Sequence, residues 1–354
     1  MIGLHTIRKE RFEVISLAYN NFLNDMNDIK EGEKYAGHYS KERSLRGKEI
    51  DALYDYIQAE TSGQLTFVID MHNIVFYPAR EFEKFLNLKA RRIVFYDVAV
   101  DNILPKLKED LQDSFLEGTS DEGVSLLFSN CPTKEAYERE IKDCMRQIYQ
   151  DESARIVKSL AKPMTRRKPL ESSGIYSSCY VNIKELFTKP DDYNFIIFQM
   201  VGKIAEGGEK IDALVSTSRN GAVLANILGW LLDKKVVHCT SLGPKYAIET
   251  DTIMKEIRKG KKYLYVFDFI CLGTEIKVLN ALLGVRDAEL VGGIGIANYI
   301  PLDSKYAQGN VLGRMTSLVS IMEYKIPYVV AGTLEDLEIL KKARENSGKA
   351  EKGV

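Results

Sequence analysis

Residues 263–277, YLYVFDFICLGTEIK, join a run of β-branched and aromatic residues to a helical pattern through a glycine turn. The run ends at Asp268, and the turn contains Gly273 and Thr274. The first amides of a helix lack intrahelical partners, and the helix dipole adds partial positive charge there. This order therefore favours a phosphate-binding turn, with Asp268 placed to take sugar hydroxyls at the carboxyl end of the strand. Most α/β folds repeat the same order without a ligand, so the segment alone leaves both interpretations open.

Strand and helix patterns alternate along the chain from about residue 170 onward. The predicted strands are 211–218, 234–242, 263–270 and 288–300, and the predicted helices are 195–207, 221–233 and 275–283. Strands that are separated by helices form a mainly parallel sheet covered on both faces. We therefore expect an α/β fold in this part of the chain.

The first 120 residues carry a second, shorter alternation. Residues 44–58 place Ile50, Leu53, Tyr54 and Ile57 on one helical face. The other predicted elements are a buried strand over 65–77, a helix over 80–88, a strand over 91–98 and a helix that begins at 101. These patterns predict a small α/β layer of about 110 residues.

A charged, amphipathic stretch over 134–161 predicts a helical connector between the two α/β regions. The basic residues TRRK at 165–168 favour an exposed linker, although such a run could also attract a phosphate or nucleic acid. The expected organisation is a small α/β domain over 1–118, a helical connector over 119–164, a larger α/β domain over 165–342 and a polar tail over 343–354.

Composition narrows the class of protein. The chain has 354 residues, of which 45% are hydrophobic and 28% charged, and a net charge of -1. This balance is typical of a soluble globular protein and gives no argument for nucleic acid or an anionic membrane as the main partner. No apolar run approaches the roughly 20 residues that span a bilayer, and residues 1–14 lack the apolar stretch of a signal peptide. We therefore expect a cytoplasmic protein.

The cysteines argue against a disulfide framework and against structural zinc. They are odd in number, widely spaced and form no CxxC pair. The five positions are Cys131, Cys144, Cys179, Cys239 and Cys271.

Four separated segments resemble the type I phosphoribosyltransferases, and among them the orotate phosphoribosyltransferase group. SSGIYSSCYVNI at 172–183 resembles the element that covers the base site, and VSTSRNGAVLANILG at 215–229 resembles the pyrophosphate loop with its helix. FDFICLGTE at 267–275 is similar to the DDVxxTGxT signature, and KIPYVVAGTLEDLEIL at 325–340 is similar to the ending of the orotate group. The resemblance covers about residues 165–342, and the four segments follow the family's order.

The resemblance implies displacement at C1 of 5-phosphoribosyl-1-pyrophosphate (PRPP) by a base nitrogen, with Mg²⁺ bridging ribose and pyrophosphate. The site must then hold two anionic ends apart and neutralise the departing one. The implied PRPP-binding residues are Ser218, Arg219, Asn220 and Gly221 for the pyrophosphate, Gly273, Thr274 and Glu275 for the 5-phosphate, and Asp268 for the ribose, the metal and catalysis. The implied base-binding residues are Ser173, Gly174 and Tyr180.

The family also carries a mobile loop after the fourth strand that closes over the leaving group. Here that stretch contains Gly243 and Pro244, with Lys245 as the candidate catalytic cation. Lys255 and Arg258 are further candidates, and all three basic residues are equally compatible with an ordinary charged surface.

The sequence departs from the family pattern at the signature. Phe267 stands where the first of two adjacent acids is usual, and Leu272 and Glu275 replace two phosphate-binding hydroxyl residues. A carboxylate at 275 facing a phosphate opposes its binding by about 1 kcal/mol even at the dielectric of water. Turned outward in the first turn of a helix, the same carboxylate is favourable by roughly 0.3–1 kcal/mol.

The base-site element also departs from the orotate enzymes. Ser172 and Ile175 stand where those enzymes carry Lys and Arg beside the glycine. We therefore expect a nitrogenous substrate other than orotate.

The N-terminal segment 43–86 is similar to STAS-like modules, in which a helix precedes a strand that ends in an acid. Asp70 and Asn73 lie at that turn, and Pro78 stands near the place where the family carries a serine. His72 beside Asp70 is compatible with acid-base chemistry, but a loop histidine without an identified partner is more often a surface or core residue. The resemblance implies that this region binds partner proteins or nucleotides.

Two functions follow from these patterns. The first is a phosphoribosyltransferase, or a hydrolase of a ribosyl bond, that acts on a nitrogenous substrate other than orotate. The second is a catalytically degenerate PRPP or nucleotide sensor that signals to a protein partner through the STAS-like region. A purely structural interaction protein is a third possibility. The family resemblance further implies a homodimer.

Overall fold

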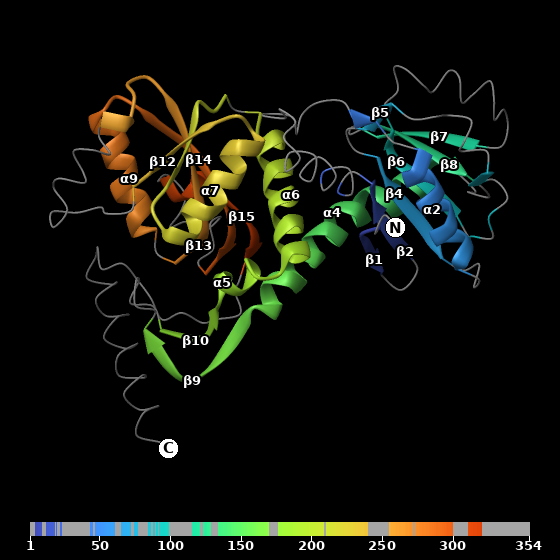
Figure 1. The fold of residues 1–354 in the computed structure, drawn as a ribbon, viewed down its shortest axis with the longest axis horizontal. Helices are drawn as coiled ribbons and strands as arrows, with labels where there is room; N and C mark the ends of the chain where they lie inside the picture. The colour runs from blue at the N-terminus through green and yellow to red at the C-terminus, as the bar shows by residue number, and fades with distance from the viewer. Residues whose placement is uncertain are drawn as a thin grey trace. The chain divides into compact units, whose positions relative to one another are not determined.

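The structure is a computed structural model that divides the chain into two compact units, residues 1–152 and residues 153–354. Figure 1 shows its helices and strands coloured along the chain. The residues that the structure describes are 4–8, 12–17, 19, 22, 43–44, 47–60, 65–71, 74–76, 84–85, 88, 90, 92–98, 115–120, 123–128, 134–169, 176–208, 210–239, 255–271, 273–299 and 311–320.

The N-terminal unit contains a mixed six-stranded sheet of order β1-β2-β4-β6-β8-β7. Strands β2, β4 and β6 are parallel, and the outer strands pair antiparallel with their neighbours. The strands are β1 (Thr6–Arg8), β2 (Phe12–Ser16), β4 (Thr66–Asp70), β6 (Arg92–Val98), β7 (Phe115–Ser120) and β8 (Gly123–Phe128). Two short strands, β3 (Arg43–Ser44) and β5 (Ile74–Phe76), form a separate parallel pair.

Helix α2 (Gly47–Ala59) supplies the helical face predicted for residues 44–58. Ile50, Leu53 and Ile57 are buried in a cluster with β-strand residues of this unit. The prediction of one continuous strand over 65–77 is wrong. The chain turns after β4, where the amide of Ile74 bonds the carbonyl of Met71 at 2.8 Å, and β4 and β5 then pair in different sheets.

Helix α4 (Lys134–Ser159) confirms the helix predicted over 134–161. It leads into strand β9 (Ala161–Pro169), which pairs antiparallel with β10 (Tyr176–Val181). The prediction of an exposed linker at 165–168 is therefore wrong, because these residues lie in β9. Prolines are tolerated in a two-stranded ribbon, where each strand has a free edge, so Pro169 does not mark a break.

The C-terminal unit contains a five-stranded sheet of order β12-β11-β13-β14-β15, in which all neighbours are parallel. Its strands are β11 (Ala213–Ser216), β12 (Lys235–His238), β13 (Lys262–Ile270), β14 (Glu289–Asn298) and β15 (Met315–Ser320). The predicted mainly parallel α/β fold is confirmed for this unit.

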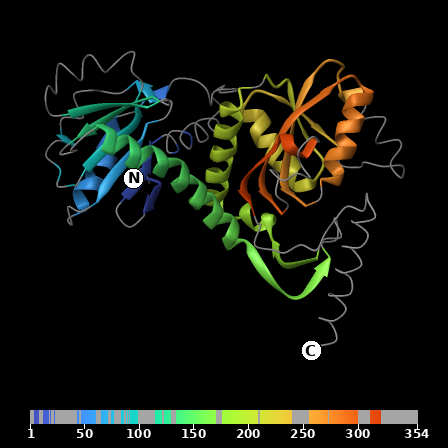
Figure 2. The same cartoon turned by 180° about the vertical axis from the view of Figure 1, so that it is seen from behind.

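Helices cover both faces of the parallel sheet, as Figures 1 and 2 show from opposite sides. Helices α6 (Pro190–Glu206) and α7 (Arg219–Leu231) contact each other, and α9 (Thr274–Val285) packs on the opposite face. Short helices α5 (Ile183–Leu186) and η4 (Val311–Arg314) complete the described elements of the unit.

The strand order fixes where a ligand can enter this sheet. From β11 the chain moves outward to β12, and it then crosses back to β13 on the other side of β11. In open parallel sheets, such a reversal leaves a crevice at the carboxyl ends of the two strands, and ligands bind there. In this unit the crevice lies between the turns that follow β11 and β13.

Candidate functional site

The turn after β11 is built around Ser218, which is the N-cap residue of α7. Its Oγ accepts a hydrogen bond of 2.9 Å from the amide of Gly221, so one of the free helix amides is already satisfied. A Cβ on Gly221 would lie 2.9 Å from the carbonyl oxygen of Val266 in β13. Glycine at this position therefore lets the start of α7 lie directly against β13.

Asp268 lies near the end of β13 and faces this turn. Its carboxylate accepts hydrogen bonds from Ser218 Oγ at 3.2 Å and from Asn220 Nδ2 at 2.8 Å, and only 6% of the residue is exposed. A carboxylate offers about four lone-pair sites, so these two bonds fix its orientation and leave acceptor capacity for a ligand. The two turns are thus connected through one acid.

The turn after β13 requires glycine at position 273. Gly273 has φ of 69° and ψ of 20°, and it is the N-cap residue of α9. A Cβ there would lie 2.2 Å from Leu312 Cδ2, which is much shorter than real contacts between carbon atoms. No side chain caps this helix start, in contrast to Ser218 at α7.

Glu275, in the first turn of α9, reaches back to β11. Its Oε2 accepts a hydrogen bond of 2.7 Å from the buried hydroxyl of Thr217, and Thr217 Oγ1 also lies 2.6 Å from Tyr265 Oη. An ionised carboxylate only accepts, so the Thr217 proton points to Glu275 and Tyr265 donates to Thr217. The residue as a whole stays exposed, so the Glu275 carboxylate bonds Thr217 while remaining in contact with solvent.

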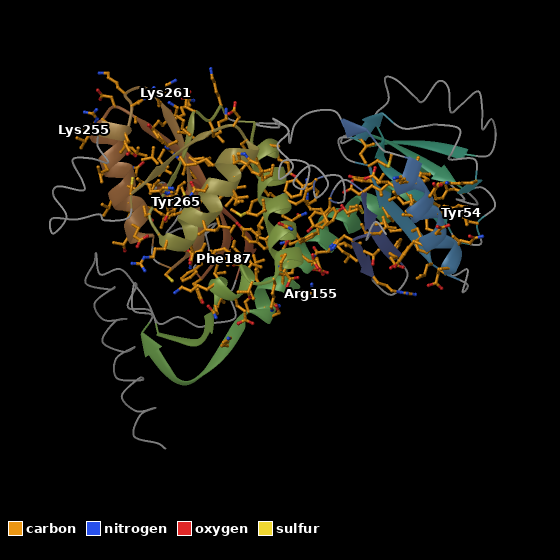
Figure 3. All side chains as sticks on the ribbon, viewed as in Figure 1. Tyr54, Arg155, Phe187, Lys255, Lys261 and Tyr265 are labelled. Atoms are coloured by element: carbon orange, nitrogen blue, oxygen red, sulfur yellow. The ribbon has the colours of Figure 1, made fainter. Side chains whose placement is uncertain are left out.

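Tyr265 is enclosed by the C-terminal unit, whereas Lys255 and Lys261 lie at its outer edge (Figure 3). Burial raises the pKa of Tyr265, and the nearby Glu275 and Asp268 add to the increase. The phenol therefore stays protonated and acts as a donor throughout the physiological pH range.

Phe267, at the position where the family carries its first acid, faces away from Asp268. Successive side chains of a strand point to opposite faces, and the Phe267 ring stacks on Tyr265 at 5.5 Å with only 1% exposed. Gly295 in β14 leaves the room for this ring, since a Cβ there would lie 2.0 Å from its carbons. The replaced acid position is therefore part of the hydrophobic core.

A cavity of about 180 Å³ opens where these turns meet. Its lining combines two carboxylates with hydroxyl, thiol and aromatic groups, and no lysine or arginine is among the lining residues that the structure describes. The lining residues are Ser218, Tyr265, Asp268, Phe269, Ile270, Cys271, Gly273, Thr274, Glu275 and Ile276.

The structure thus brings together most of the residues proposed from sequence for PRPP. Ser218, Asp268, Gly273, Thr274 and Glu275 line one cavity, and Asn220 and Gly221 are bonded to two of them. The Arg219 side chain is exposed at the first residue of α7.

The other proposed positions are not part of the described cavity. Lys255 and Arg258 are exposed and do not line it. Tyr180 lies in β10, where its backbone pairs with Lys162. Ser173, Gly174 and Lys245 of the proposed base site and loop, together with Leu272 of the signature, lie outside the residues that the structure describes.

Sequence reasoning missed Thr217 and Tyr265, which hold Glu275 in place. Thr217 directly precedes the proposed pyrophosphate loop, so its place in the sequence could have identified it as a residue of the site. Tyr265 belongs to the hydrophobic face of a strand, and its hydroxyl contact depends on a residue 48 positions away. Phe269 and Cys271 also line the cavity without having been proposed.

The N-terminal unit contains a separate polar cluster at the carboxyl ends of β2 and β4. Asp70 is buried and bonded by the hydroxyl of Tyr149 from α4, and this hydroxyl lies 2.8 Å from Ser16 Oγ. A tyrosine therefore covers the acid that was considered for acid-base chemistry. His72 and Asn73 lie outside the described residues.

Comparisons with known proteins find likeness only among solved structures. No protein-family model and no curated protein sequence matches the chain. The orotate phosphoribosyltransferase of Aeropyrum pernix is similar at 15% identity and a TM-score of 0.36, over 54% of this chain and 98% of that one. The adenine phosphoribosyltransferase of Thermoanaerobacter pseudethanolicus is similar at 15% identity and a TM-score of 0.36, over 46% of this chain and 97% of that one.

The UMP synthase of Leishmania donovani is similar at 11% identity and a TM-score of 0.39, over 85% of this chain and 57% of that one. Likeness at these identities and TM-scores does not assign the chain to a family.

The described part of the chain offers neither a membrane span nor a metal cluster. None of its helices is both long and apolar enough to cross a membrane. Within the same residues, no group of three or more His, Cys, Asp or Glu side chains is arranged to hold a metal ion.

Proposed function

We propose that the C-terminal unit binds PRPP or a nucleotide in the cavity at the carboxyl ends of β11 and β13. The observation that carries this proposal is Asp268, a nearly buried carboxylate held by Ser218 and Asn220 at the crevice where the strand order reverses. Its orientation is fixed while acceptor sites stay available, which suits the recognition of ribose hydroxyls.

The pyrophosphate or phosphate of the ligand would bind at the start of α7. The helix dipole favours an anion there, and Arg219 at the first helical position supplies a guanidinium that can pair with phosphate oxygens in two places. Mg²⁺ is commonly held by one or two carboxylates together with substrate phosphates. Asp268 fits as the single protein carboxylate of such a site, and the metal would neutralise charge on the leaving group.

Transfer of the phosphoribosyl group to a nitrogenous base other than orotate is the reaction that we propose for an active site of this kind. Ser218, Arg219 and Asn220 would hold the departing anion, and Asp268 would orient the ribose. Phe269 and Cys271, which line the cavity, would give the incoming base an apolar wall.

A second candidate function is a PRPP or nucleotide sensor without turnover, and two observations favour it. Phe267 occupies the core in place of an acid, and Glu275 holds a carboxylate in the turn that would receive a phosphate. In this version we propose that the N-terminal unit is a STAS-like module that reports ligand binding to a protein partner, in a homodimer located in the cytoplasm.

Isothermal titration calorimetry tests the proposed site. The ligands are PRPP with Mg²⁺, UMP and ribose 1-phosphate, and the variants are Asp268→Asn and the control Asp233→Asn. Asp233 is an exposed acid with φ of 50° just before β12, at the opposite edge of the sheet, and asparagine tolerates that conformation. We expect binding of a ribosyl ligand that Asp268→Asn abolishes and Asp233→Asn retains.

Absence of heat from the parent protein with all three ligands would contradict the proposal. Pyrophosphate release from PRPP across a panel of bases separates its two versions. Release with a base other than orotate supports transfer, and binding without release for any base supports the sensor.

A further inference from the structure

A row of exposed lysines lies at the amino-terminal end of the parallel sheet, at the opposite end of the strands from the cavity. Lys235 and Lys262 are the first residues of β12 and β13, and both strands pair with β11, which lies between them. Neighbouring strands lie about 4.8 Å apart, so the backbones of these two residues are separated by about 10 Å. Figure 3 shows Lys261 at this end of the C-terminal unit. We call the row the lysine edge, and its exposed members are Lys210, Lys234, Lys235, Lys261 and Lys262.

An acid within the lysine edge is already neutralised. The carboxylate of Asp212, just before β11, accepts hydrogen bonds from the amide of Lys262 at 2.9 Å and from Lys261 Nζ at 3.1 Å. These two groups, together with the charge of Lys210, lower the pKa of Asp212. Within the lysine edge, Lys261 alone has an ion-pair partner among the residues that the structure describes, and Asp233 is a further exposed acid there. The lysines outnumber these two acids, so the edge is locally positive although the whole chain has a net charge of -1.

An exposed tryptophan adjoins the lysine edge. Trp230 is 39% exposed on the last turn of α7, and its carbonyl accepts a hydrogen bond of 3.4 Å from the amide of Asp233, directly before the first lysines. The other exposed residues between positions 224 and 239 are polar, namely Asn226, Asp233, Lys234 and Lys235. Binding to an anionic membrane uses a broad apolar face beside the basic residues, which one indole does not supply. Stacking on a nucleic-acid base needs only one exposed ring.

We propose that the lysine edge and Trp230 form a binding surface for single-stranded nucleic acid. The lysines contact phosphates of the strand, and the indole stacks on a base. A row of separated ammonium groups fits an anion with repeated charges, and proteins that bind single strands combine such positive charge with exposed aromatic rings. Because this surface lies away from the cavity, the proposal does not depend on the ribosyl ligand.

Fluorescence anisotropy with labelled oligothymidylate tests the proposal on the full chain. Contact with four phosphates predicts a slope of about -3 for the logarithm of affinity against the logarithm of salt concentration, so affinity should fall about twentyfold between about 50 and 150 mM salt. Binding should also quench the fluorescence of Trp230, which is the single tryptophan of the chain.

Three variants separate the contributions of charge and stacking. Lys235→Glu should weaken binding about tenfold or more and make the salt slope shallower, because it removes a phosphate contact and adds a repulsive charge. Trp230→Ala should weaken binding about fivefold or more and leave the slope unchanged, since stacking releases no counterions. The control Lys184→Glu reverses the charge of an exposed lysine in α5, outside the lysine edge, and should bind as the parent does.

Absence of oligothymidylate binding by the parent at about 50 mM salt would overturn the proposal. Binding to vesicles of phosphatidylserine and phosphatidylcholine without binding to the oligonucleotide would overturn it in favour of a membrane surface. An affinity that either Lys235→Glu or Trp230→Ala leaves unchanged would also overturn it, as would an equal loss of affinity in Lys184→Glu and Lys235→Glu.

Discussion

Substitution of Gly273 by alanine tests whether the turn before α9 is as tightly packed as its geometry indicates. Two costs arise at this position. The left-handed conformation, with φ of 69°, costs a non-glycine residue about 1–2 kcal/mol. The new Cβ would also lie 2.2 Å from Leu312 Cδ2, and an extra methyl group in a packed core costs about 1–3 kcal/mol. The sum predicts a loss of about 2–5 kcal/mol in the free energy of unfolding.

Gly260→Ala is the matched control for the conformational part of that cost. Gly260 has φ of 70°, and a Cβ at this position would meet no atom within 4 Å, so only the backbone cost applies. We expect a loss of about 1–2 kcal/mol there. Both substitutions reduce the entropy of the unfolded chain by the same amount, so that contribution cancels in the comparison.

Urea unfolding followed by tryptophan fluorescence measures both variants. Trp230 in α7 is the single tryptophan of the chain, so the signal reports the C-terminal unit. Leu312→Ala should lower the free energy of unfolding less in the Gly273→Ala background than in the parent, because it removes the overlap between the new Cβ and the Leu312 side chain. Equal losses for Gly273→Ala and Gly260→Ala would refute the close packing of Leu312 against the turn.

Three other predictions concern the strand that carries the site and its neighbours. Phe267→Asp should destabilise the C-terminal unit by about 3–5 kcal/mol in urea, because it removes a core ring packed on Gly295; a stability near that of the parent would contradict the core assignment. Thr217→Val should cost about 1–3 kcal/mol, since the buried Tyr265 hydroxyl loses its acceptor, and Thr217→Ser should restore most of the loss. Burial raises the pKa of Cys239 from 9.0 to about 12, so between these pH values the unfolded chain loses this proton and the folded chain keeps it. With rising pH, the free energy of unfolding should then fall more steeply in the parent than in Cys239→Ala, by about 1.4 kcal/mol for each pH unit. Unfolding free energies that are measured in urea and change with pH in the same way for both proteins would contradict this prediction.

The sequence predicts β11, β12, β13 and β14 of the parallel sheet in the C-terminal unit, because these are mainly apolar runs separated by helices, but it does not predict β15. Burial on both faces dictates such runs, so β11, β13 and β14 follow from hydrophobicity alone. The Ser218 cap is also local, since a serine before a helical pattern satisfies a nearby amide. These elements depend on residues within a few positions of each other.

The features that sequence did not predict depend on partners far along the chain. The orientation of Glu275 is decided by Thr217, 58 positions away. The core position of Phe267 is possible because Gly295 in another strand leaves space for the ring. The basic residues of strand β9 carry no apolar pattern and so predict a linker, and only pairing with β10 makes this segment a strand.

The central position of β13 gives the candidate site an uneven mobility. β13 pairs with β11 over residues 263–265 and with β14 over residues 262–270, so each of its paired amides stays bonded until the ladder that holds it breaks. In native-state hydrogen exchange, amides of this kind are protected up to the global unfolding free energy, whereas helix ends open at much lower cost. The acid at the floor of the cavity would keep its position through the fluctuations that open the surrounding turns, so an arriving sugar would meet a preorganised acceptor rather than one that must first be ordered.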